Sequence, residues 1–260
     1  MEVNASETVM NHGVDTSSAP LVAGVNGVRC LVSESLAVHK PQSTRSGRDR
    51  DDRAGNWVSK GGRRCLGLLL ILTLMRGLLY AAVVPPWQGP DETGHFEYAW
   101  LTAHYGRLPT REDISPAFEQ ELLASLYEWR YGEFIGRPLP EGMPARMADL
   151  PIEIHARRSR TIQQERFSLS YLWQALFLLP VRFHDLTSQL LVARLSSVLL
   201  SVVIVWLAFA TFSDLVLSEL LLICAMTAVV VFLPQHTFIN SMVGDGTLAE
   251  LMTCLVLFCW

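Results

Sequence analysis

The sequence has few cysteines, and they form no recognisable pattern. The five, Cys30, Cys65, Cys224, Cys254 and Cys259, include no Cys-x-x-Cys pair, the spacing on which most zinc modules and dithiol redox sites depend. The spacing therefore predicts neither a metal site nor a disulfide framework. Because three of the five lie in or beside apolar runs, we expect them to act as small apolar side chains between helices.

Strong charge of either sign is also missing. Charged residues make up 18% of the chain and the net charge is −4, so the sequence lacks the positive surplus that binding to a nucleic-acid backbone needs. Half of the residues are hydrophobic and the mean hydropathy is +0.27. These residues are gathered in long runs, which is typical of a membrane protein rather than of a soluble core.

Residues 1–62 lack any sustained apolar period. They are rich in small and polar residues, and the mixed-charge stretch "PQSTRSGRDRDDR" cannot bury enough surface to order itself. The segment is too long and too polar for the start of a signal peptide. We predict a disordered cytoplasmic tail, and an over-extended start codon is the alternative.

The first long apolar run, Cys65–Val84, has the length of a membrane span. Its twenty residues cover about 30 Å at about 1.5 Å per residue, the thickness of a bilayer core. Basic residues precede it: Arg45, Arg48, Arg50, Arg53, Lys60, Arg63 and Arg64. This cluster predicts a cytoplasmic N-terminus, so that Pro85 emerges on the outer face. Arg76 interrupts the run, and we expect it to face other helices or a polar cavity, because a lone arginine in lipid is costly.

Further helices are predicted around a long external loop, residues 85–189. Within the loop, 167–183 is short and carries polar residues, so it is either a short span or a helix lying in the membrane interface. The runs 190–212 and 217–238 predict two more spans. The last run, 248–260, has thirteen residues and covers only about 20 Å, short of the bilayer core. We therefore expect the chain to be the front part of a longer protein. The predicted fold class is all-α, a truncated polytopic transmembrane helix bundle.

One helix of the external loop has clear local signals. In "SPAFEQELLASLYEWR", Ser115 is a good N-cap and Pro116 suits the first helical position. Apolar residues follow at helical spacing: Phe118, Leu122, Leu123 and Leu126. They predict a helix that buries one face, either on the membrane surface or over the active face.

The stretch directly after the first run, "PPWQGPDETGHFEYAW", gathers two acids and a histidine at the predicted water boundary. One interpretation is structural: Asp91 and Glu92 simply open a helix and complement its dipole. In such a helix, however, Asp91, His95, Tyr98 and Thr102 form one polar stripe. A carboxylate there lies where a low dielectric favours a raised pKa, as a general base needs. The stripe is therefore a candidate reaction site.

The 25 residues "PPWQGPDETGHFEYAWLTAHYGRLP" resemble the first external loop of polyprenyl-phosphate-sugar-dependent glycosyltransferases of the GT-C superfamily. They are similar in particular to the DUF2142 and RgtA/B/C/D-like membrane proteins, which resemble the protein O-mannosyltransferases. The resemblance continues more loosely through "ARLSSVLLS", Ala193–Ser201, and the turn with Asn240 and Asp245. It implies a GT-C-like domain over 63–260 with an active site that opens to the external face. One departure is "RFSLSYLW", which lacks the His-Pro-Pro-like element of many relatives.

The resemblance also implies roles for the three catalytic candidates. Asp91 would be the general base that takes the proton of an acceptor hydroxyl as it attacks the anomeric carbon, with inversion and departure of polyprenyl phosphate. Glu92 would position this carboxylate or share its charge, and His95 would orient it or a ligand. The acceptor is a glycan, a lipid or a protein that the sequence does not specify.

Three further residues are candidates for binding substrate. Arg194 would stabilise the leaving phosphate, with a snorkelling anchor as the alternative. Asp245 would be a second acid at the site, or only a turn residue between glycines. Tyr98 would contact substrate from the polar stripe. A divalent metal such as Mg or Mn between Asp91 and Asp245 is a further expectation.

This assignment constrains the topology. Asp91 and Asp245 share a face only if an even number of crossings separates them, which selects the interfacial interpretation of 167–183. The protein is then a multi-pass cell-membrane protein surrounded by membrane lipids. The connector "SDLVLSE" contains neither Lys nor Arg, so the positive-inside rule does not test this arrangement. A non-catalytic polytopic protein, either a transporter fragment or an assembly subunit, is the alternative function. If the chain is a fragment, we expect it to lack helices that enclose the donor.

Overall fold

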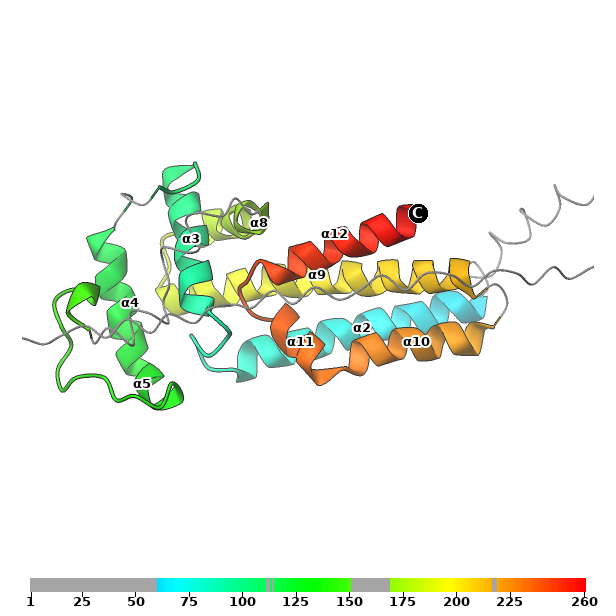
Figure 1. The fold of residues 1–260 in the computed structure, drawn as a ribbon, viewed down its shortest axis with the longest axis horizontal. Helices are drawn as coiled ribbons and strands as arrows, with labels where there is room; N and C mark the ends of the chain where they lie inside the picture. Colours follow the sequence, from blue (N-terminus) through cyan, green and yellow to red (C-terminus); the bar gives the residue numbers. More distant parts are fainter. Residues whose placement is uncertain (1–59, 111–112, 114, 151–168, 217–218) are drawn as a thin grey trace, which may run out of the picture. The chain divides into compact units, whose positions relative to one another are not determined.

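The computed structural model describes residues 60–110, 113, 115–150, 169–216 and 219–260, and in these ranges the protein is helical, without strands (Figure 1). The chain divides into two units, 1–43 and 44–260, and every described residue belongs to the second. Most of the predicted tail therefore lies outside the described residues. All-helical architecture was predicted from the apolar runs, and it is confirmed for the described part.

Two helices are long and apolar enough to cross a membrane, α2 (Lys60–Val83) and α9 (Leu186–Leu215). A third crossing is possible by length if α10 (Leu220–Phe232) and α11 (Pro234–Asn240), which are bent by 59°, count as one span. Helix α2 begins five residues before the predicted start, so residues 60–62 belong to the helix rather than to the tail. Helix α9 likewise extends past both predicted ends.

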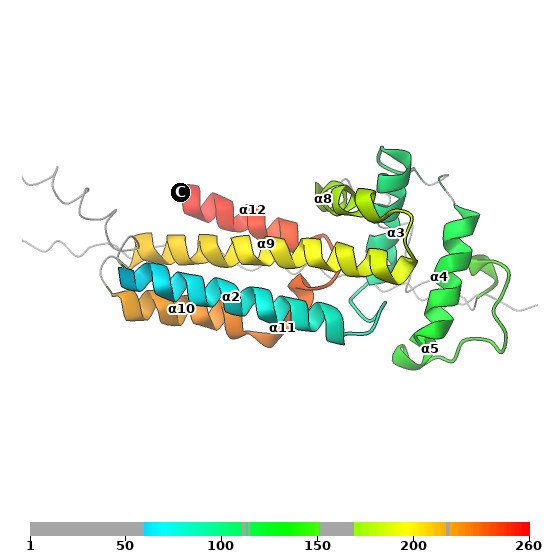
Figure 2. The same ribbon diagram turned by 180° about the vertical axis from the view of Figure 1, so that it is seen from behind.

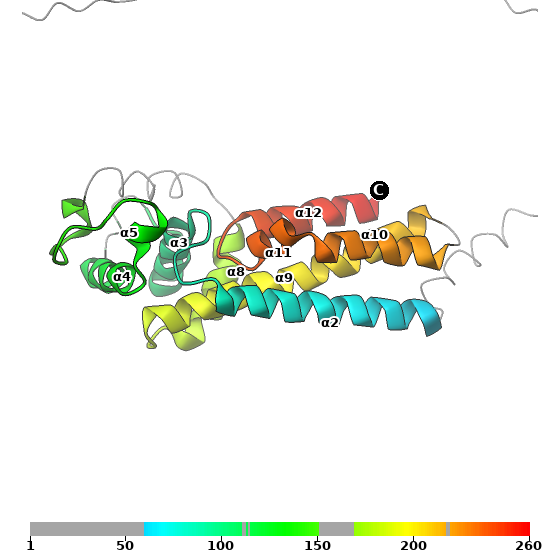
Figure 3. The ribbon, with the colours of Figure 1, turned by 90° about the horizontal axis from the view of Figure 1, so that it is seen from below.

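The single helix predicted over 217–238 is wrong, because the helix breaks at Leu233, whereas a membrane crossing by this stretch stays a prediction. This residue has an extended ψ of 111°, and Pro234 opens α11. Proline has no N–H to donate to the preceding turn, and its ring disfavours helical geometry in the residue before it. The chain therefore changes direction there, and α11 lies beside the later part of α2 (Figure 3).

Helix α9 is the central element of the apolar part and packs against α2, α10 and α12 (Gly246–Cys259) (Figures 1 and 2). At one point α2 and α9 approach so closely that a Cβ added to Gly77 would lie 2.6 Å from Val198 Cγ1. Small residues permit such close approach between apolar helices. The polar turn predicted between 240 and 247 is confirmed as residues 241–245, between α11 and α12.

A second group of helices packs around the amino-terminal end of α9. It consists of α3 (Glu92–Tyr105), α4 (Pro116–Glu128), α5 (Tyr131–Phe134) and α8 (Leu169–Leu178). The 3-10 turn Leu179–Val181 continues α8, and a second 3-10 turn covers Met147–Asp149.

The two predictions made for this group can be compared with the structure. The predicted helix at 115–130 is confirmed as α4: Ser115 Oγ accepts a hydrogen bond from Phe118 N at 3.3 Å. The four predicted apolar positions of α4 are all buried. Helix α8 is too short to count as a span, which agrees with the interfacial interpretation of 167–183, and its place in a membrane stays a prediction.

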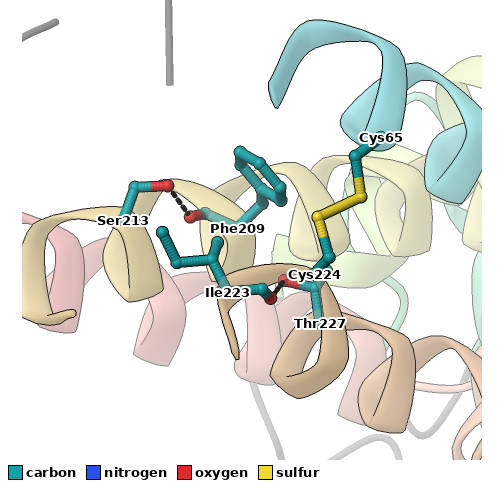
Figure 4. Close-up of a disulfide and its surroundings, with 6 residues drawn as sticks. All are labelled: Cys65, Phe209, Ser213, Ile223, Cys224 and Thr227. Atoms are coloured by element: carbon teal, nitrogen blue, oxygen red, sulfur yellow. Dashed lines mark hydrogen bonds between the residues drawn. A yellow bond between two sulfur atoms is a disulfide. The ribbon is translucent and has the colours of Figure 1, made fainter. Parts of the chain in front are cut away.

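A disulfide joins Cys65 of α2 to Cys224 of α10 (Figure 4), with their Cα atoms 6.6 Å apart. The expectation that these two cysteines only fill apolar space is therefore wrong. Two nearby hydroxyls bond back along their own helices, Thr227 to Ile223 O at 2.9 Å and Ser213 to Phe209 O at 2.7 Å. The bond ties the start of α2 to the start of α10.

Candidate functional site

A buried ion pair joins the first residue of α3 to α9. Arg194 Nε donates to Glu92 Oε1 at 2.8 Å, and Nη2 donates to Oε2 at 2.7 Å. Both side chains are almost fully buried, at 2% and 0% exposed. The guanidinium thus binds the carboxylate through two parallel hydrogen bonds, the strongest arrangement available to an arginine–carboxylate pair.

Arg194 also closes the end of α2. Nη1 donates to Ala81 O at 3.0 Å and to Val84 O at 2.6 Å, and Nη2 donates to Pro85 O at 3.0 Å. These carbonyls lie in or just beyond the last turn of the helix, where they have no helical partner. All five N–H donors of Arg194 are thereby used within the protein.

The use of all N–H donors of Arg194 within the protein bears on its two predicted roles, a cation for the leaving phosphate and a snorkelling anchor. The side chain is buried, so it does not snorkel. It forms part of the wall of a pocket of about 240 Å³ between the ends of α2 and α9, yet it has no free N–H to offer a phosphate in this arrangement.

Glu92 is equally saturated. Besides Arg194, it accepts hydrogen bonds from Gly89 N and Val243 N, both at 3.3 Å. The close approach at Gly89 favours glycine, because an added Cβ would lie 3.0 Å from Glu92 Cδ and from Met242 Cβ and would force these side chains to shift. Four segments meet at this carboxylate: the loop after α2, the start of α3, α9 and the turn before α12. Glu92 therefore holds the framework of the site, as the predicted positioning role requires.

Asp91 differs from Glu92 in its exposure and in its backbone conformation. It is exposed, its side chain makes no capping hydrogen bond, and its backbone lies in the left-handed region with φ 49°. A non-glycine residue in this region costs about 1–3 kcal/mol. The strain is maintained by its neighbours, because Asp91 O accepts from Gly94 N and His95 N at 3.0 and 3.2 Å while Glu92 is held by Arg194.

Trp87 is a second strained residue of the same loop, with φ 70°. It is buried, and its Nε1 donates to Ser125 Oγ of α4 at 2.9 Å. Its ring packs edge-on against Phe96, with centroids 5.5 Å apart. The loop between α2 and α3 is thus fixed from both sides, which gives Asp91 a defined place.

Asp91 is one of the residues that line a pocket of about 490 Å³. Its other lining residues come from the same loop, from α5 and its C-cap, and from α11: Gln88, Gly89, Pro90, Tyr131, Phe134, Ile135 and Phe238. An apolar and aromatic wall with one carboxylate is the usual composition of a small-molecule site. Of the predicted site residues, only Asp91 lines this pocket.

His95 lies one turn into α3 and is buried against α8. Its Nδ1 is 2.8 Å from the Tyr171 hydroxyl. Burial lowers the pKa of His95 below its usual value, although the carboxylates of Asp245, Asp91 and Glu92 act in the opposite direction. The imidazole is therefore neutral at pH 7, and the predicted acids of the site all act electrostatically on it.

Tyr98 faces α8 rather than the pocket. Its ring centroid lies 4.3 Å from that of Tyr171, and burial raises the pKa of its phenol. Thr102, the last member of the predicted stripe, bonds back to Tyr98 O at 2.8 Å. The helical register of the stripe is confirmed, but beyond Asp91 it forms a packed contact with α8.

Asp245 is the residue before α12, and its side chain makes no capping hydrogen bond. The adjacent Gly244 is held by Gln174 of α8, whose Nε2 donates to Gly244 O at 2.8 Å. Among the described residues, no group of three or more His, Cys, Asp or Glu side chains lies close enough to hold a metal ion. A divalent ion between Asp91 and Asp245 stays an expectation, and no step below uses one.

A separate polar cluster, which the sequence analysis did not single out, joins α11 to α12. Glu250 accepts from Asn240 Nδ2 at 2.9 Å and lies 2.7 Å from His236 Nε2. The spacing of His236 and Asn240, one helical turn apart, was readable in the sequence, but their pairing with Glu250 depends on the fold. Tyr171 was also missed, because its role depends on contact with α3.

Comparison of the chain with models of known protein families gave no match, and comparisons with curated proteins and with solved structures gave none either.

Proposed function

We propose that the protein is a membrane glycosyltransferase that moves a sugar from a polyprenyl-phosphate donor to an acceptor hydroxyl at the outer face. The proposal rests on the residues of the loop after α2 and on the GT-C-like resemblance of that stretch. The observation that carries it is Asp91, a strained and exposed carboxylate in an aromatic-lined pocket directly above a membrane-length helix.

In this mechanism Asp91 takes the proton from the acceptor hydroxyl. The acceptor oxygen forms a bond to the anomeric carbon as the bond from that carbon to the phosphate oxygen breaks. Polyprenyl phosphate leaves with the electron pair, and the configuration inverts. General-base catalysis of this kind contributes typically about 10²- to 10⁴-fold to a rate.

The neighbouring residues have supporting roles. Glu92, paired with Arg194, fixes the backbone next to Asp91, and His95 is held against Tyr171 of α8. The aromatic side chains of the pocket, Tyr131, Phe134 and Phe238, provide faces on which a sugar ring packs.

The test is product formation in membrane vesicles that contain the chain. We would supply a polyprenyl-phosphate-linked hexose carrying a radiolabel and follow released polyprenyl phosphate and the labelled acceptor. Vesicles from cells without the chain are the control. We expect label in the acceptor with inverted anomeric configuration, and equal label in both preparations would reject the proposal.

One observation favours the second candidate, a non-catalytic subunit. The only predicted phosphate-binding cation, Arg194, is saturated by Glu92 and the carbonyls of α2. In this alternative, the loop after α2 has only a structural role and connects α9 rigidly to the second group of helices, α3, α4, α5 and α8. Absence of product, with stable incorporation of the chain into membranes, supports it.

A further inference from the structure

The two arginines inside the long apolar helices have opposite surroundings. Every donor of Arg194 in α9 is bonded within the protein. Arg76 in α2 makes one described hydrogen bond, from Nη2 to Thr237 Oγ1 at 3.3 Å. Its Nε is buried without an acceptor, and it forms no ion pair with any other described residue.

A guanidinium whose N–H donors are not all hydrogen-bonded is energetically costly at this position. The group stays protonated in any protein environment, and a charge inside a membrane-length apolar helix is rare unless it faces a partner or a functional path. A buried donor without an acceptor adds to this cost, because it has lost its hydrogen bond to water. The contact of the guanidinium with the Phe232 ring, at 5.3 Å, offsets part of this cost but leaves Nε without an acceptor.

A purely structural role at the helix break does not account for Arg76. The break at Leu233 frees carbonyls at the end of α10, and a nearby cation would complement them. The single proton of the Thr237 hydroxyl serves one of these carbonyls at a time, Val231 O at 3.4 Å or Leu233 O at 3.3 Å, and the one described hydrogen bond of Arg76 goes to that hydroxyl rather than to a carbonyl. The donors of Arg76 are therefore left for another acceptor.

The place of Arg76 connects it to the Asp91 pocket. Tyr80 follows Arg76 by one turn on the same face of α2, and its ring centroid lies 6.4 Å from that of Phe238. Phe238 in turn lines the pocket that contains Asp91. Arg76 thus lies beneath this pocket, within the apolar helices rather than in the second group of helices, α3, α4, α5 and α8.

We propose that Arg76 binds the phosphate group of a lipid-linked ligand at the break between α10 and α11. A planar guanidinium with free N–H groups matches phosphate oxygens. The neighbouring α2 side chains Met75 and Leu79 are exposed, so a ligand with an apolar chain can cover them while its phosphate reaches Arg76. Free inorganic phosphate would have to enter this apolar region without such compensation. The inference rests on the proposed function in that the bound phosphate would belong to the sugar donor.

The test measures binding without catalysis. The chain, purified in detergent, is titrated with a long-chain polyprenyl phosphate, with the corresponding polyprenol, and with inorganic phosphate. The variants are Arg76→Gln and Arg76→Lys, with Arg146→Gln as the control because Arg146 is an exposed arginine of the outer loop. Thermal unfolding of each variant separates loss of binding from loss of fold.

We expect polyprenyl phosphate to bind Arg76→Gln about 10- to 100-fold more weakly than wild type, Arg76→Lys to be intermediate, and Arg146→Gln to be unchanged. The proposal is overturned if Arg76→Gln binds like wild type, if polyprenol binds as tightly as its phosphate, or if inorganic phosphate displaces the lipid at equal concentration. The two wild-type comparisons decide the matter even if Arg76→Gln does not fold. Failure of this binding test with sugar transfer intact removes only the inference, whereas binding as expected without any transfer removes only the proposed function.

Discussion

Arg194 of α9 and Glu92 of α3 are 102 residues apart in the chain and form a buried, two-fold hydrogen-bonded ion pair with contacts of 2.8 and 2.7 Å. The pair also bonds to the end of α2 and to the turn before α12. It therefore connects the apolar helices to the second group of helices, α3, α4, α5 and α8, and fixes the backbone next to Asp91.

Removing either partner leaves the other buried and uncompensated. We expect Glu92→Gln and Arg194→Leu each to lower the free energy of unfolding by about 3–5 kcal/mol, measured by denaturant unfolding in detergent. The pair Arg107–Asp113 lies at the surface and is also joined by two hydrogen bonds, both at 2.7 Å, from Nη1 and Nη2 of Arg107, and it serves as the control. Asp113→Asn should have a much smaller effect. Equal losses in the two pairs would mean that burial of the Glu92 pair contributes nothing.

The close contact of α2 with α9 gives a prediction at two glycines of one helix. A Cβ at Gly77 meets Val198 Cγ1 at 2.6 Å, whereas a Cβ at Gly67 meets nothing within 4 Å. Gly77→Ala should therefore destabilise the protein by about 1–3 kcal/mol. Gly67→Ala should be neutral or stabilising by roughly 0.5–1 kcal/mol, because alanine favours helix. Unfolding temperatures of the two variants compare them directly, and a Gly77→Ala protein as stable as Gly67→Ala would refute the contact.

Burial of His95 predicts a pH dependence of stability. Its folded pKa is lowered from the usual 6.5, so the unfolded chain binds more protons there than the folded protein does. Stability contributed by this group is therefore present above about pH 6.5 and declines as the pH falls through the folded pKa.

His95→Gln, which cannot titrate, should lose this part of the dependence between pH 7 and pH 5. The measurement is the unfolding midpoint against pH for both proteins. Parallel curves would show that His95 does not titrate differently on folding, despite the opposing carboxylates of Asp245, Asp91 and Glu92.

The disulfide predicts that two particular cysteines do not react with a thiol reagent. Without reductant, a maleimide should modify Cys254 and Cys259 but neither Cys65 nor Cys224, which should appear as one cross-linked peptide by mass spectrometry. Disulfides persist in oxidising compartments, while the basic cluster before α2 predicts that this end of the helix is cytoplasmic. Recovery of both cysteines as free thiols from freshly isolated membranes would favour the cytoplasmic placement over a stable bond.

Local signals in the sequence predicted the helices well. The cap at Ser115 and the spacing of Phe118 and Leu122 specify α4 from residues that are near neighbours in the chain, and long apolar runs specify α2 and α9. The break at Leu233 had a local signal as well, the proline at 234, but the continuous apolar run outweighed it in the prediction.

The connections between distant residues could not be predicted in this way. Asp91 and Glu92 are adjacent and chemically alike, and only the fold makes one an exposed carboxylate in a pocket and the other a buried anchor. The saturation of Arg194 and the Cys65–Cys224 bond likewise depend on packing between segments more than one hundred residues apart. Side-chain spacing along one helix contains no information about such partners.

The central claim is that the carboxylate of Asp91 is the base for sugar transfer, and the most direct measurement is the transfer rate of Asp91→Asn. Asp149→Asn is the matched control, because Asp149 is a carboxylate of the same outer loop that is bonded only to Arg146 among the described residues. The account predicts that Asp91→Asn transfers labelled sugar about 10²- to 10⁴-fold more slowly than wild type, with unfolding unchanged, and that Asp149→Asn transfers at the wild-type rate. Transfer by Asp91→Asn at the wild-type rate would contradict it.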